Sequence, residues 1–240
     1  MNQKCVATVC RSVLNGLTIV LLGGCALHPA QTAAPTYYSL DFPVPTTMPL
    51  LPGPSEQAPT LLISPMIAAP GYDSTHIIYT RTAHQLAYFA RSVWIDTPTR
   101  MIAPLMAATL ATSGTFRAVT PTTSAVAGEL RLNTELVRLQ HDFTVQPGQL
   151  RFTLRATVLD NATRKVLAWR EFDENLPVAS DAPDAGIEAA NSAVQAGLQE
   201  LSVFCSAVAL QWRDSKNTGP RLQNQPASEQ GAATLGVPSI

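Results

Sequence analysis

Residues 150–160 read LRFTLRATVLD, and apolar and polar side chains alternate along almost the whole stretch. A period of two is typical of a strand that buries one face and leaves the other in water. Residues 129–140 show the same alternation, with positions 130, 132, 134 and 136 on the less polar side. After a tight turn at 160–163, residues 164–175 continue the pattern. We therefore expect three long strands that form an antiparallel meander.

Shorter segments before this meander also have the composition of strands. Residues 36–42 are rich in aromatic side chains, and residues 60–65 form an almost continuous apolar run. Residues 75–81 and 85–90 predict a hairpin, because both are rich in β-branched and aromatic residues and flank a short turn. A last short strand is expected at 116–119.

Two helices complete the expected fold. The first has an N-cap and a first-turn proline at 97–98 and should end near Gly114. At Pro104 we expect either a kink or a helix whose regular part starts late. The second begins at 180–184 and carries apolar residues at helical spacing as far as Trp212. These elements predict an α+β fold, with a mixed, mainly antiparallel sheet and two helices packed on one face.

The first 24 residues are typical of a secretory signal peptide. Lys4 and Arg11 both precede a short apolar segment, and residues 1–24 contain no acidic side chain. This segment is shorter than the roughly 20 residues that a membrane-spanning helix needs. It ends in LGGC at 22–25, the pattern of a lipobox, where cleavage leaves an N-terminal cysteine that carries diacylglycerol. We expect lipidation of Cys25; an ordinary signal peptide or an uncleaved anchor is the alternative.

The expected mature chain contains one folded domain. Residues 25–35 predict a tether, 36–212 the α+β domain with a Pro-rich loop at 43–59, and 213–240 a disordered polar tail. Ala26 follows the lipidated cysteine, where an aspartate would favour retention at the inner membrane. We therefore expect the protein at the outer membrane, facing the periplasm; the inner membrane is the alternative.

Composition and motifs favour neither catalysis nor nucleic-acid binding. The formal net charge is −1, so the chain lacks the basic footprint of a nucleic-acid-binding protein. The sequence has no nucleophile elbow, phosphate-binding loop or zinc-protease motif. We therefore expect no enzyme activity, no cofactor and no metal. An envelope hydrolase is the weakest alternative, since no nucleophile and base pair can be named.

The remaining titratable side chains have ordinary interpretations. His76 and His84 could meet across the hairpin and hold a metal, but solvated or hydrogen-bonded histidines are favoured, including His141 at a strand end. Cys205 lies in an apolar helical pattern and is expected to be buried, unpaired and inert. Two acidic pairs are interpreted as surface charge and helix cap: Asp173 with Glu174, and Asp181 with Asp184.

Four aromatic side chains are candidates for contact with a partner or a lipid. They are Tyr72, Tyr88, Phe89 and Trp94. Aromatic residues are enriched at interaction hot spots, which motivates the choice. The competing interpretation is that these side chains belong to the core of the sheet.

The order of motifs resembles a known family. Tyr37, Tyr38 and Leu40 open the match, and residues 63–65, 77–81 and 86–94 continue it, before a Pro-started helix, charged strands and an alanine-rich helix. Over residues 36–212 the chain is similar to the auxiliary lipoprotein component of ABC-type transport systems, the one associated with MCE-domain lipid transporters.

This resemblance implies a partner rather than a reaction. It implies an MCE-domain protein and an ABC permease and ATPase as partners, attachment to a membrane through the N-terminal lipid, and transport of phospholipids or other hydrophobic compounds. Because some relatives assemble into rings, it also implies a homo-oligomeric ring. The alternative is a stand-alone lipoprotein that binds an apolar ligand in a pocket between helices and sheet.

Overall fold

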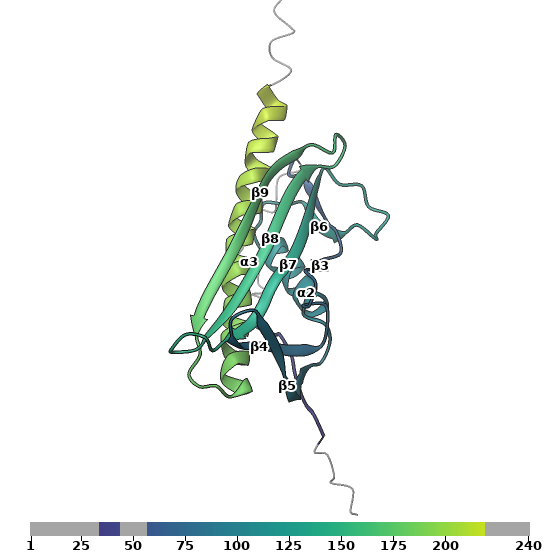
Figure 1. Ribbon diagram of the computed structural model, residues 1–240. Helices are drawn as coiled ribbons and strands as arrows, with labels where there is room; N and C mark the ends of the chain where they lie inside the picture. The colour runs from purple at the N-terminus through teal and green to yellow at the C-terminus, as the bar shows by residue number, and fades with distance from the viewer. Residues whose placement is uncertain (1–33, 44–56, 219–240) are drawn as a thin grey trace, which may run out of the picture. The chain divides into compact units, whose positions relative to one another are not determined.

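The computed structural model describes residues 34–43 and 57–218 (Figure 1). The predicted signal peptide, Cys25, nearly all of the tether, most of the Pro-rich loop and residues 219–240 lie outside these ranges. The described residues form a mixed sheet of nine strands with two helices. The predicted α+β class is therefore confirmed.

Strand β7 (Leu130–Asp142) is the centre of the sheet. One of its edges pairs along its whole length with β8 (Gln149–Asp160), which in turn pairs with β9 (Val166–Pro177), and both pairings are antiparallel. The predicted meander is confirmed. Its alternation has the expected effect in β8, because Phe152 and Leu154 are fully buried whereas Arg151 and Arg155 are only partly buried. Thr153, between the two core residues, is polar but is also buried.

Strand β7 contains a bulge that its alternation did not predict. The pairing with β8 shifts between Leu136 and Arg138, so one extra residue is inserted at this point. Even-numbered positions face the core as far as Leu136, but beyond the shift Leu139 and His141 are the buried residues on that side. Arg138 and Gln140 are thereby turned to the opposite face of the sheet.

Three short strands follow one another along the other edge of β7. β2 (Thr60–Ile63), β3 (Ile67–Ala68) and β4 (His76–Thr82) pair in parallel with its beginning, middle and end. The four residues of β2 are all buried, as the apolar run in this segment predicts. The chain between residues 60 and 82 thus runs alongside β7 in the same direction.

The remaining strands extend the sheet from β4 and β2. β5 (Gln85–Trp94) forms the predicted antiparallel hairpin with β4, β1 (Thr36–Tyr38) adds to β5 in parallel, and β6 (Ala118–Pro121) adds to β2 in parallel. Parallel pairings outnumber antiparallel ones among the described strands, but the antiparallel pairings are the long ones. The sheet is therefore mixed and, by length, mainly antiparallel.

Both helices lie on the same face of the sheet (Figure 1). α2 (Pro98–Ala111) starts after Thr97, as predicted, and continues through Pro104. α3 (Pro183–Thr218) packs across β8 and β9 and extends six residues beyond the end predicted at 212. Its length and composition would also suit a membrane-spanning helix, but its apolar stripe is buried against the sheet.

Large side chains fill the space between α3 and the sheet. Phe152, Phe172, Leu198 and Leu201 are buried members of one hydrophobic cluster. Gly197 allows the helix to approach closely, since a Cβ atom at this position would lie 2.7 Å from the ring of Phe152. This packing supports a solid core rather than an apolar ligand pocket between helix and sheet.

Candidate functional site

Two of the four predicted contact aromatics belong to the core. Trp94 is only 3% exposed, so its prediction as a surface contact is wrong. Phe89 is half-buried, with its ring centroid 4.7 Å from that of Tyr79 and 5.4 Å from that of His141. Both side chains point to the helix side of the β4–β5 hairpin, where removal of their apolar area from water stabilises the fold.

The other two aromatics lie on the accessible side. Tyr88 is 59% exposed, and its ring stacks against His76 with 4.3 Å between centroids. Tyr72 is half-buried and lines a cleft on the sheet face opposite the helices. These two residues remain candidates for contact with a partner or a lipid.

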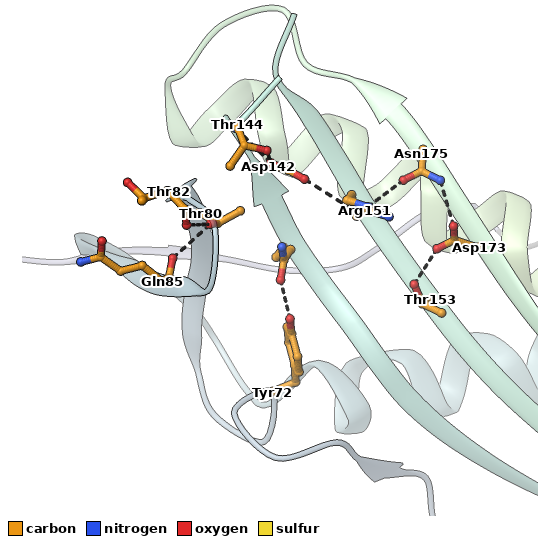
Figure 2. Close-up of polar contacts among 11 residues, drawn as sticks. Tyr72, Thr80, Thr82, Gln85, Asp142, Thr144, Arg151, Thr153, Asp173 and Asn175 are labelled. Carbon is orange, nitrogen blue, oxygen red and sulfur yellow. Dashed lines mark hydrogen bonds and ion pairs between the residues drawn. The ribbon is translucent and has the colours of Figure 1, made fainter. Parts of the chain in front are cut away.

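This cleft, which we call the open-face cleft, has a volume of about 420 Å³. Its walls are Tyr72, Thr144, Thr80 of β4 and the β4–β5 turn at residues 83–86, and its floor carries polar side chains of the two central strands. Figure 2 shows several of these side chains converging from separate segments. The floor residues are Arg138, Gln140 and Asp142 of β7 and Arg151 of β8.

Hydrogen bonds hold the floor of the cleft in place. The Tyr72 hydroxyl donates to Gln140 Oε1. The backbone N–H of Thr144 donates to Asp142 Oδ1 over 3.0 Å, and Arg151 Nη1 lies 3.5 Å from Asp142 Oδ2. On the far side, Arg151 Nε donates to Asn175 Oδ1 over 3.1 Å (Figure 2). The arginine is therefore fixed between two strands.

The charge states of the cleft follow from these contacts. Burial alone would raise the pKa of the Asp142 carboxyl, but hydrogen bonds from Thr144 and the charge of Arg151 outweigh it and hold the pKa below its usual value. Burial raises the pKa of the Tyr72 hydroxyl, against an opposing effect of Arg138. Near neutral pH the cleft thus carries two guanidinium groups, one carboxylate and a neutral phenol.

The bulge in β7 explains why these residues meet. It places Arg138 opposite Thr153 and Gln140 opposite Arg151, on the face away from the helices. Bulges commonly re-aim side chains in this way. Tyr72 was predicted as a contact residue, but the floor residues were not, because the alternation at 129–136 predicts an unbroken pattern as far as residue 140. The run of Leu136, Val137 and Arg138 is the signal of the interruption.

His141 is the clearest exception to the expected behaviour of the histidines. It is 1% exposed, and neither ring nitrogen has a hydrogen-bond partner, so the prediction of a solvated or hydrogen-bonded side chain is wrong. The bulge turns it into the core, where Phe89 and Phe143 pack against its ring edge-on. Burial lowers the pKa of His141 to about 4, so the ring is neutral at physiological pH.

Other titratable groups have structural roles. Asp181 forms an ion pair with Arg81 at 2.9 Å, and Asp184 accepts a hydrogen bond from Tyr38. Cys205 is buried and unpaired as predicted, and burial raises the pKa of its thiol to about 12, which leaves it without thiolate reactivity. Within residues 34–43 and 57–218, no group of three or more histidine, cysteine or acidic side chains could hold a metal ion.

A second cavity, of about 300 Å³, lies between the helices. It is lined by Phe42 and Pro43, by the C-terminal end of α2 and by the middle of α3, where Val203 is exposed. Its lining contains hydroxyl and amide side chains but no charged group. It therefore differs from the open-face cleft, which is lined by charged side chains.

The class of this protein follows from its match to a sequence family. The model of the family described as the ABC-type transport auxiliary lipoprotein component matches residues 38–202, and the chain belongs to this family. The description of this family names a component of a transport system.

Solved structures agree with this fold. A DUF330 protein from Xanthomonas campestris superimposes with a TM-score of 0.65 at 22% sequence identity, over 75% of this chain and 99% of that chain. An uncharacterized protein superimposes with a TM-score of 0.53 at 13% identity, over 72% of this chain and 97% of that chain. No curated protein matches the chain in sequence. At these identities the structures establish the fold alone.

Proposed function

We propose that this chain is the lipid-anchored auxiliary component of an MCE-associated ABC transporter of phospholipids or other hydrophobic compounds. The observation that carries the proposal is the family match over residues 38–202, which starts shortly after the lipobox at 22–25. The anchor on Cys25 holds the domain at the outer membrane, facing the periplasm. The domain acts there by binding protein partners and catalyses no reaction.

The proposed partners are an MCE-domain protein and, through it, the permease and ATPase. The exposed Tyr88 and the neighbouring Leu86 on β5 supply an apolar surface for contact. A homo-oligomeric ring is part of the same proposal. The buried cluster around Phe152 and Phe172 supports protein contact rather than storage of an apolar ligand between helix and sheet.

Metabolic labelling with radioactive palmitate tests the anchor. We expect the full-length chain to be labelled and to fractionate with the outer membrane, and Cys25→Ala to lose the label and to accumulate as precursor. A matched Cys10→Ala variant changes a cysteine inside the predicted signal peptide and should be labelled as the native chain is. Equal labelling of the Cys25→Ala variant would contradict the proposal.

A further inference from the structure

We propose that the open-face cleft binds the phosphodiester headgroup of a membrane phospholipid, with Arg138 and Arg151 as the groups that contact the phosphate. This inference deepens the proposed function, on which it rests for the nature of the ligand. It assigns a headgroup site to the auxiliary component itself.

The charge balance of the cleft favours an anion. Arg151 shares its charge with Asp142, at 3.5 Å. Among the described residues Arg138 forms no ion pair at 4 Å or less, but its charge, together with that of Arg151, helps to lower the pKa of the Asp173 carboxyl. The side chains that line the cleft include two guanidinium groups and one carboxylate, and both arginines also act on the Asp173 carboxylate beside the cleft. A phosphodiester would place its single negative charge next to the two guanidinium groups. Arginine is the side chain best suited to phosphate, because its fork of N–H donors matches two phosphate oxygens.

The hydrogen-bonding groups of the cleft are arranged for an acceptor-rich ligand. Asp142 Oδ1 accepts from both the backbone N–H and the hydroxyl of Thr144, so this oxygen is already satisfied. Gln140 Oε1 accepts from Tyr72, which leaves the amide NH₂ of Gln140 as a donor. The two arginines and this amide therefore present donors, and phosphate oxygens are acceptors only.

An apolar rim beside the cleft favours a lipid over free phosphate. Leu86 lines the cleft and is 53% exposed, and Tyr88, two residues along β5 on the same face, is also exposed. His76 stacks on Tyr88 and holds its ring. A phosphate in the cleft would place an attached acyl chain next to this rim, where burial of its methylene groups adds affinity.

Native mass spectrometry of the full chain, purified from its own membranes in a non-ionic detergent and delipidated, tests the inference. Three probes separate the sources of the phosphate: dioctanoylphosphatidylglycerol, dioctanoylglycerol and inorganic phosphate. Arg138→Gln removes the arginine that forms no ion pair with Asp142, so the buried Asp142 carboxylate keeps its partner Arg151. Arg131→Gln is the matched control, because it removes the same charge from the same strand, outside the cleft. Circular dichroism and melting temperature establish that each variant is folded.

We expect the native chain and Arg131→Gln to bind dioctanoylphosphatidylglycerol equally, and Arg138→Gln to bind it at least about tenfold more weakly, as loss of a charged hydrogen bond predicts. The native chain should bind dioctanoylglycerol, which lacks the phosphate, at least as weakly as Arg138→Gln binds dioctanoylphosphatidylglycerol. Equal binding by Arg138→Gln, equal binding of dioctanoylglycerol, or phosphate binding as tight as that of the phospholipid would overturn the inference. Recovery of the MCE-domain partner with Arg138→Gln is measured in parallel. If the partner is recovered but the phospholipid result contradicts the inference, only the headgroup site fails; if the partner is not recovered with the native chain either, the proposed function fails.

Discussion

Gly186 and His141 are in direct contact across the interface between α3 and β7. A Cβ atom added to Gly186 would lie 1.7 Å from Cε1 of the His141 ring. The backbone of the first turn of α3 therefore packs directly against the imidazole ring. Only glycine fits at position 186, because any side chain there would overlap the ring. This contact joins the start of the last helix to the end of the central strand.

Gly186→Ala tests this contact. Helix propensity alone would make alanine more stable than glycine by about 1 kcal/mol in the helix. We expect the opposite sign, a loss of about 1–3 kcal/mol in the free energy of unfolding, because the His141 ring is buried and cannot move aside. Urea denaturation measures it. In a His141→Ala background the same substitution should be tolerated, and an equal loss there would contradict the contact.

Stability should depend on pH through His141. Its pKa is about 4 in the folded protein and about 6.5 in the unfolded chain, so between these values the unfolded state binds the proton and folding is penalised. We expect the free energy of unfolding to be unaffected by this group above pH 6.5 and to fall by roughly 3 kcal/mol as the pH drops to 4.

His141→Leu should remove this pH dependence and should be at least as stable at pH 8, because it eliminates two buried nitrogens without partners. His76→Gln is the control, since His76 is exposed on β4. The comparison is the difference between variant and native unfolding free energies at each pH. A difference that stays constant from pH 8 to pH 4 would show that His141 is accessible to protons in the folded state.

Trp212 stabilises the far end of α3 through Asp160. Its Nε1–H donates to Asp160 Oδ2 over 2.8 Å, while Asp160 Oδ1 accepts from the backbone of the β8–β9 turn. The Trp212 hydrogen bond is the largest cause of the low pKa of Asp160, which lies well below its usual range. A lowered carboxyl pKa stabilises the fold above the unfolded value, and this stabilisation is lost as the pH falls further.

Trp212→Phe should therefore lower the free energy of unfolding by about 1.5–3 kcal/mol at pH 7, as expected for a hydrogen bond to a charged group. The deficit should shrink as the pH falls below about 4. Trp169→Phe is the matched control, because Trp169 is exposed on β9. Similar losses in both variants would mean that the indole ring, and not its N–H group, supplies the stability.

Substitutions of Tyr88 and Trp94 should distinguish an effect on partner binding from an effect on stability. Trp94→Ala removes a buried side chain and is expected to destabilise the protein by about 3–5 kcal/mol. Tyr88→Ala changes an exposed side chain, so its effect on the unfolding free energy should be within about 0.5 kcal/mol. Recovery of the partner from membranes should instead fall for Tyr88→Ala. Undiminished recovery would remove Tyr88 from the proposed contact surface.

The local parts of the fold could be predicted from the sequence, and the non-local parts could not. Alternation in residues 150–160 predicts a strand because its cause, one buried face, acts residue by residue. The parallel pairing of β2, β3 and β4 with β7 depends on contacts between segments that are distant in the sequence, so no local pattern predicts it. Helix spacing predicted α3 as far as Trp212, and the last polar turn to Thr218 carries no such pattern.

The open-face cleft depends on a single inserted residue. Without the bulge after Leu136, the alternation would have placed Gln140 on the core face and Leu139 on the other. The sequence shows three residues in a row that do not alternate clearly, but it does not say which of them is extra. Tyr72 was named from its chemistry, while its partner Gln140 is 68 residues away and could not be paired with it.

Recovery of the transporter with the full-length chain tests the central proposal most directly. The native chain is tagged at its C-terminus, extracted from its own membranes in a mild detergent and purified, and the associated proteins are identified by mass spectrometry. We expect an MCE-domain protein, with its permease and ATPase, to be recovered in proportion to the native chain and to be diminished for Cys25→Ala. Repeated recovery of the correctly folded, lipidated chain without any MCE-domain protein would contradict the account.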